Sequence, residues 1–90
     1  MTNTGMKPTV VDNVDDRRKE KVKFGFMMGK YLRTVHESKN ISQESLSLKA
    51  GYYRTFVGKI EQGLYSPSMH TIWRLSDALG LKLSDYFKGF

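Results

Sequence analysis

The sequence predicts an all-α protein built from five short helices. Apolar residues recur at intervals of three and four along most of the chain, which is the spacing of one helix face. Serine or glycine stands at the expected start or end of most of these segments. Because these helix-end signals follow one another along the chain, no segment favours a β-strand.

The first helix is expected to follow an N-terminal arm. Residues 1–19 combine Gly5 and Pro8 with small polar residues and a charge cluster, and they show no helical periodicity. We therefore expect a flexible arm that becomes helical at about residues 15–20, followed by a single domain over residues 20–90. The inward face of the first helix is expected to carry four apolar residues at intervals of 4, 4 and 3: Phe24, Met28, Leu32 and Val35.

Four shorter helices are expected after it, the third of the chain spanning about residues 54–62. Serines are the expected N-caps or openings of the second, fourth and fifth helices: Ser42, Ser68 and Ser84. Glycines are expected to end the second, third and fourth helices: Gly51, Gly63 and Gly80. The core of these helices is expected to contain Leu46, Val57, Ile60, Ile72 and Leu75.

Length and composition exclude several classes of protein. A chain of 90 residues that is 39% hydrophobic has room for one small domain, without a deep enzyme cleft. It has no cysteine, and its two histidines, His36 and His70, are too few for a metal site. We find no nucleophile–base set either, so we expect no enzymatic activity, no cofactor and no metal. No apolar run approaches a membrane span, and a cytoplasmic protein is expected.

The charge balance points to an anionic partner. Fifteen Lys and Arg against nine Asp and Glu give a net charge of +6, which suits nucleic acid or a membrane surface. A basic cluster over residues 17–23 is interrupted by Glu20 and follows Asp15 and Asp16. It is either a solvated helix face or an arm that wraps DNA.

The second and third helices form a predicted helix-turn-helix over about residues 42–62. Gly51 permits a tight left-handed turn, and the small side chain of Ser47 suits the point where the two helices touch. This arrangement leaves the start of the third helix projecting. A projecting helix start can enter the major groove of DNA, which is about 12 Å wide.

The motif extends well beyond one glycine. In one-letter code it reads SQxxLSxxAGxxRTxVxxIExG over residues 42–63. It resembles the Cro and phage-repressor type of helix-turn-helix, the XRE-like family, over roughly residues 28–87. The resemblance implies a five-helix DNA-binding domain that regulates transcription and binds palindromic double-stranded operators as a homodimer. The segment from Arg54 to Gly63 is also similar to the restriction–modification controllers, small members of the same family.

The resemblance implies roles for individual residues. Gln43 corresponds to the residue that opens the second helix and contacts a phosphate. Arg54 and Thr55 correspond to the exposed start of the recognition helix, and Lys59 lies about one turn further on. Phe56 is suited to a thymine methyl or the sugar backbone, and Tyr53, Tyr65 and Ser66 to phosphates at the rim. The expected DNA-binding residues are Gln43, Tyr53, Arg54, Thr55, Phe56, Lys59, Tyr65 and Ser66.

Three positions depart from the family pattern. Tyr53 stands where the family usually has a short N-cap, so the third helix is expected to lack a side-chain cap. Gly58 lies inside that helix, where its missing side chain lets DNA or another helix approach closely. His36 replaces a family arginine, and we expect it to contact Glu61 and to stabilise the fold when it is protonated.

The C-terminal aromatic residues have two possible roles. A domain of 90 residues has little interior for so many rings, so one expectation is a homodimer interface containing Trp73, Tyr86, Phe87 and Phe90. The alternative is a core with scattered surface rings. Three functions remain open: an operator-binding regulator without a small-molecule ligand, a restriction–modification controller or antitoxin-like autoregulator, and a protein-interaction module that keeps the fold.

Overall fold

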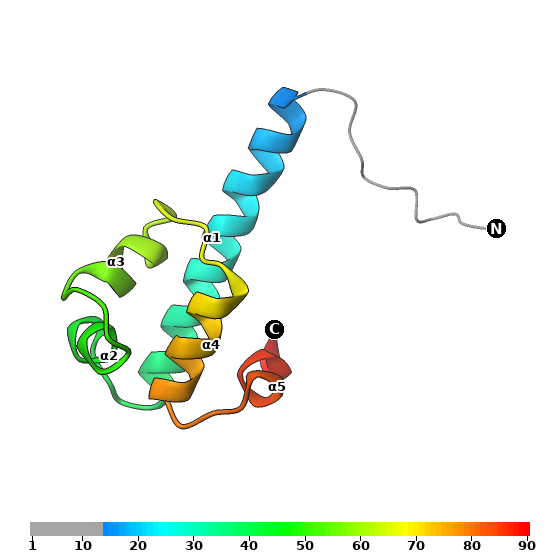
Figure 1. The fold of residues 1–90 in the computed structure, drawn as a ribbon. Coiled ribbons are helices and arrows are strands. Elements are labelled where there is room, and N and C mark those ends of the chain that lie inside the picture. The colour runs from blue at the N-terminus through cyan, green and yellow to red at the C-terminus, as the bar shows by residue number, and fades with distance from the viewer. Residues whose placement is uncertain (1–13) are drawn as a thin grey trace.

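The computed structural model describes residues 14–90, and within that range the chain is all-helical, as predicted (Figure 1). The long helix α1 runs beside four shorter helices, and a short 3₁₀ turn ends the chain. The elements are α1 (Val14–Ser38), α2 (Gln43–Lys49), α3 (Phe56–Glu61), α4 (Met69–Ala78), α5 (Leu83–Tyr86) and the 3₁₀ helix η2 (Phe87–Gly89). Because α1 already begins at Val14, residues 14–19 belong to a helix and not to an arm. The rest of the expected arm, residues 1–13, lies outside the described residues.

Most helix ends follow the local signals in the sequence. The hydroxyls of Ser42 and Ser68 each accept a hydrogen bond of 3.0 Å from the backbone three residues on. Glycines with positive φ follow α2, α3 and α4: Gly51 at +88°, Gly63 at +78° and Gly80 at +77°. The predicted cap at Ser84 is wrong, because Lys82 is the N-cap of α5 and makes no side-chain cap.

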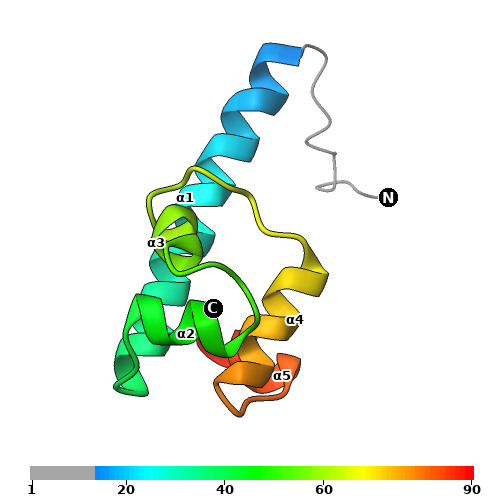
Figure 2. The same ribbon diagram turned by 60° about the vertical axis from the view of Figure 1, so that its left-hand side comes forward.

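The core lies between α1 and the shorter helices. All five predicted core residues of α2, α3 and α4 are buried, and so are Met28, Leu32 and Val35 of α1. Phe24, expected on the same inward face, is 48% exposed. The first turns of α1 extend past the other helices (Figures 1 and 2), so the cover over this face is incomplete toward the N-terminal end of α1.

The backbones of α1 and α3 approach closely at Gly29. A Cβ atom at this position would lie 2.5 Å from the carbonyl oxygen of Ile60 and 2.9 Å from the Cα of Glu61. Only glycine therefore allows α3 to sit where it does on α1. This contact matters for function because α3 carries the candidate site.

Tyr86 joins α5 to α1. Its side chain is 1% exposed, its ring meets the ring of Tyr31 edge-on at 5.2 Å, and the Tyr31 hydroxyl donates to the Tyr86 carbonyl. The expectation that Tyr86 lies in a dimer interface is therefore wrong, because a core ring has no surface left for a partner. No helix within residues 14–90 has the length and apolar character needed to cross a lipid bilayer.

Candidate nucleic-acid interface

The α2–α3 turn is held by Ser47, which is fully buried. Its hydroxyl donates to the carbonyl of Gln43 at 2.8 Å and accepts the N–H of Val57 at 2.9 Å. The small residue predicted at this helix contact thus makes hydrogen bonds to both helices. Since Val57 lies in the first turn of α3, this bond also satisfies an N–H group that the helix itself leaves unpaired.

Arg74 of α4 fixes the same turn from the other side. Its guanidinium donates to the carbonyl of Ala50 through two nitrogens, at 2.9 and 3.2 Å, and lies 5.1 Å from the centre of the Tyr52 ring. A Cβ at Gly51 would lie 2.4 Å from this guanidinium. Sequence reasoning missed Arg74, because nothing local in the sequence connects α4 with a turn 24 residues earlier.

Arg54 and Thr55 are exposed, but they precede the helix they were expected to open. The helix α3 begins at Phe56, with Thr55 as an N-cap that makes no side-chain hydrogen bond. The predicted N-cap position of Tyr53 is thus wrong, because Thr55 occupies it, although the expected lack of a side-chain cap is confirmed. The Nε of Arg54 lies 3.2 Å from a carboxylate oxygen of Glu44 in the first turn of α2.

A hollow of about 510 Å³ between α2 and α3 brings four of the predicted residues together. Its lining consists of Gln43, Glu44, Arg54, Thr55, Gly58, Lys59 and Gln62. Glu44 and Gln62 were not predicted, although Gln62 lies three residues after Lys59 and so shares its face of the helix. The hollow presents amide, hydroxyl, guanidinium and ammonium donors, beside one carboxylate.

Gln43 is positioned by a buried pair beneath it. Its side-chain amide donates to one oxygen of Glu61 at 2.8 Å, and the other oxygen lies 2.6 Å from Nε2 of His36. The side chains of His36 and Glu61 are each 5% exposed, so the predicted contact between them is confirmed. The Nδ1 of His36 faces the carbonyl of Ile41 at 2.8 Å. Both ring nitrogens of His36 therefore have a hydrogen-bond partner within the buried cluster.

Gly58 makes room for this arrangement. A Cβ atom at Gly58 would lie 3.0 Å from the side-chain oxygen of Gln43. The glycine inside α3 therefore lets the Gln43 side chain lie across the helix, which explains a residue that costs helix stability.

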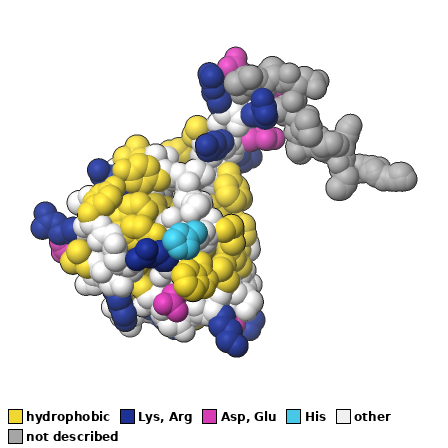
Figure 3. Space-filling view, in the orientation of Figure 1, with side chains coloured by type: hydrophobic (Ala, Val, Ile, Leu, Met, Phe, Trp, Pro, Cys, Tyr) yellow, Lys and Arg dark blue, Asp and Glu magenta, His cyan; other side chains and the backbone are white. Residues whose placement is uncertain are grey.

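A cluster of aromatic side chains borders the hollow. Phe56 is half-buried and stacks on Tyr52 with ring centres 4.1 Å apart. The hydroxyls of Tyr53 and Tyr65 lie 2.9 Å apart, and this hydrogen bond raises the pKa of Tyr53. Lys59 places its ammonium 5.5 Å from the centre of the Tyr53 ring. Figure 3 shows hydrophobic side chains over α3, with basic side chains at the edge of this area.

The predicted rim and dimer residues are distributed as follows. Ser66, in the loop before α4, is exposed. Trp73 and Phe90 are 51% and 54% exposed, whereas Phe87 is half-buried against the core. Of the four proposed interface rings, Trp73 and Phe90 thus present the most surface. His70, on the exposed side of α4, stacks on Trp73 with ring centres 6.0 Å apart.

Within residues 14–90, no three His, Asp or Glu side chains cluster as a metal site would require.

Comparison with known proteins places this geometry in context. A family model described as "Helix-turn-helix" matches residues 30–86. An uncharacterised HTH-type transcriptional regulator of Methanocaldococcus jannaschii is 36% identical over 58 residues, covering 64% of this chain and 83% of its own. The control protein C.BamHI of Bacillus amyloliquefaciens is 35% identical over 60 residues, 66% of this chain and 74% of its own.

A third relative is the immunity repressor protein of Bacillus phage phi105. It is 28% identical over 57 residues, which cover 63% of this chain and 40% of the phage protein. No solved structure matches the chain.

Proposed function

Since this chain belongs to the helix-turn-helix family, we propose that it is a transcriptional regulator that binds double-stranded DNA in a sequence-specific manner. The observation that carries the proposal is the exposed pair Arg54 and Thr55, which stand before α3 beside Gln43 and Lys59 in one hollow. The start of α3 enters the major groove, where these side chains reach base edges.

Arg54 is the main base-reading residue. Its guanidinium pairs with the O6 and N7 of a guanine through two hydrogen bonds. In the free protein Glu44 holds it at 3.2 Å, with both side chains more than half exposed. Exposed ion pairs contribute only about 0–1 kcal/mol, so exchanging the carboxylate for a guanine costs little. Thr55 offers its methyl group or hydroxyl to a neighbouring base.

The other residues that line the hollow or border it fix the place of the protein on the DNA phosphates. Gln43, held by Glu61, donates to one phosphate at the start of α2. Lys59 and the paired hydroxyls of Tyr53 and Tyr65 contact the backbone further along, together with Ser66. Phe56 supports these tyrosines with its half-buried ring, so its contribution is positional.

We propose further that the protein binds a palindromic operator as a homodimer. Two recognition helices then read half-sites about 34 Å apart, one helical turn of DNA. Trp73 and Phe90 are the exposed rings that suit the dimer contact, with the accessible edge of Phe87. Such a protein represses transcription, or recruits polymerase, by its position on the operator.

A narrower role is favoured by one relative. The control protein C.BamHI is 35% identical over a stretch that covers 74% of its length. A restriction–modification controller that regulates its own promoter is therefore the second candidate. A protein-interaction module is disfavoured, because such a surface would need apolar residues where Arg54 and Thr55 stand.

The test is selection of bound sequences from a random pool of double-stranded DNA. We expect a palindromic consensus, with binding that weakens steeply as salt rises. Arg54→Ala should relax preference at one base position per half-site, by about 1–3 kcal/mol. Lys88→Ala, on the distant helix η2, is the matched control for loss of one cation and should leave the consensus unchanged. Selection without any consensus would contradict the proposal.

A further inference from the structure

The first four turns of α1 lie outside the part of the chain that the family model matches. The match begins at residue 30, whereas α1 begins at Val14. Figures 1 and 2 both show the first of these turns extending past the other helices, whereas Met28 and Gly29, at their end, pack on the core and on α3. The projecting turns are therefore a feature of this chain that packing within the shared domain does not explain.

This extension exposes apolar side chains in a regular pattern. Phe24 and Met27 are 48% and 46% exposed. Tyr31, which is partly buried and lies within the matched residues, follows at an interval of four. Intervals of three and four form the seam by which one helix packs along another. Phe24 also continues the core face of Met28 and Leu32, whereas Met27 and Tyr31 lie one residue before those two core residues, on the neighbouring stripe of α1.

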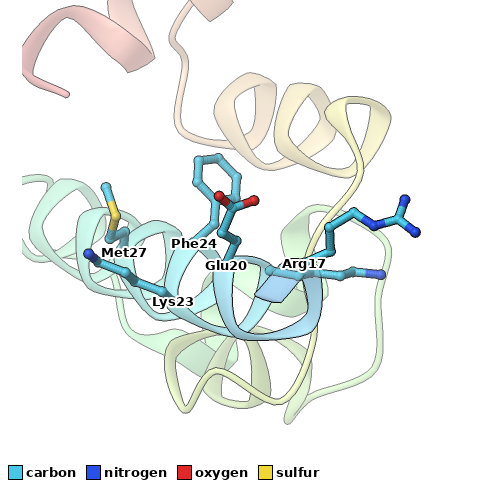
Figure 4. Close-up of a pocket in the computed structure, with 6 residues that line it drawn as sticks. Arg17, Glu20, Lys23, Phe24 and Met27 are labelled. Carbon is cyan, nitrogen blue, oxygen red and sulfur yellow. The ribbon is translucent and has the colours of Figure 1, made fainter. Parts of the chain in front are cut away.

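Charged side chains border the apolar part of this seam. Phe24 and Met27 line an open groove of about 530 Å³ with Arg17, Glu20, Lys21 and Lys23. Figure 4 shows Phe24, Glu20 and Met27 rising from the same side of α1. Three cations against one carboxylate make the groove positive.

We propose that this face of α1 docks an acidic amphipathic helix of another protein. The partner's apolar residues would pack on Phe24 and Met27, and its carboxylates would lie beside Arg17, Lys21 and Lys23. This proposal does not depend on DNA binding, since the α1 seam shares no residue with the hollow between α2 and α3.

A second copy of the chain suits the groove less well. In the antiparallel register that sets Phe24 against Met27 of the other copy, Lys21 lies opposite Lys30 at both ends of the pair. Like charges directly opposed across an interface destabilise it. DNA would use the cations but leave Phe24 and Met27 without a partner.

The proposal is tested with a synthetic helix of about three heptads, carrying leucine at the seam positions and glutamate beside them. A second peptide, with lysine in place of glutamate, is the charge control. Binding to the full chain is measured by fluorescence anisotropy, and circular dichroism verifies that each variant is folded. We expect the acidic peptide to bind and the basic peptide not to bind.

Variants of the groove then locate the contact. Met27→Glu should weaken binding of the acidic peptide by at least about tenfold, as for a buried contact residue. Val22→Glu places the same charge on an exposed apolar position of α1 outside the groove, and should change affinity by no more than about twofold. Reversing Lys21 and Lys23 to glutamate should exchange the preference between the two peptides.

Three results would overturn the proposal. The first is that neither peptide binds, or that both bind equally. The second is that Met27→Glu and Val22→Glu weaken binding alike. The third is that Phe24→Glu dissociates a dimer of the chain in analytical sedimentation. A loss of DNA binding when Lys21 and Lys23 are replaced by glutamate, in a chain that binds neither peptide, would count in the same way. These last outcomes would assign the face to a second copy or to DNA.

Discussion

Replacing Gly29 by alanine should destabilise the domain, although alanine is the better helix former. The new Cβ would lie 2.5 Å from the carbonyl oxygen of Ile60 and 2.9 Å from the Cα of Glu61. Ordinary contact requires about 1 Å more, so α3 must move as a backbone unit. Such overpacking costs about 1–3 kcal/mol. A contact with backbone atoms should lie at the upper end of this range, because no side chain can turn away.

Gly25→Ala is the matched control on the same helix. Its new Cβ would meet only the carbonyl oxygen of Tyr65, at 3.9 Å, which is ordinary contact. This substitution should therefore show the gain in helix propensity alone, about 1 kcal/mol. At Gly29 the same gain is subtracted from the overpacking cost, which leaves a net loss of about 2 kcal/mol.

The two variants are compared by urea and thermal unfolding followed by circular dichroism. For a domain of this size, 1 kcal/mol shifts the Tm by roughly 4–8 °C, so the variants should fall on opposite sides of the wild type. Gly29→Ala should also weaken DNA binding, because it displaces α3. If both substitutions change the free energy of unfolding equally, the close approach of α1 and α3 is not the reason for Gly29.

Three further predictions concern buried polar groups. Glu61→Ala leaves the ring of His36 and the amide of Gln43 without an acceptor and should lower the free energy of unfolding by about 3–5 kcal/mol. Glu61→Gln should cost clearly less, because its amide can satisfy both groups. ¹⁵N signals that show hydrogens on both ring nitrogens of His36 only with Glu61 would verify the ion pair, whereas equal losses of stability in the two variants would contradict it. The hydroxyl of Tyr86 has no hydrogen-bond partner among the described residues, so Tyr86→Phe should raise the free energy of unfolding by up to about 1 kcal/mol near neutral pH. Burial also raises the pKa of Tyr86 in the folded protein. The free energy of unfolding of the wild type should therefore keep its full value below about pH 10 and fall above it, where only the unfolded chain readily loses this proton. A phenylalanine variant with the same alkaline decline would contradict this. Ser47→Ala removes the acceptor of a buried N–H at the start of α3 and should cost about 1–3 kcal/mol by urea unfolding, while no loss would mean that another group satisfies that N–H.

The sequence by itself determined where most helices end. Ser42 and Ser68 cap through bonds to residues three positions on, and Gly51, Gly63 and Gly80 supply positive φ at the helix ends. Such signals depend on a few neighbouring residues, so they act in the same way whatever the rest of the chain does. The core of α2, α3 and α4 was equally predictable, because helical periodicity marks the face that must be buried.

Only the tertiary structure decided which apolar side chains are covered at the two ends of the chain. Phe24 continues the periodic face of α1 but stays 48% exposed, whereas Tyr86 is buried because Tyr31, 55 residues earlier, meets it. It likewise set Glu44 beside Arg54 and Arg74 against the turn at Ala50. Periodicity states that one face of a helix is apolar; whether that face meets another element depends on helix lengths and on contacts between distant segments, which no local pattern contains.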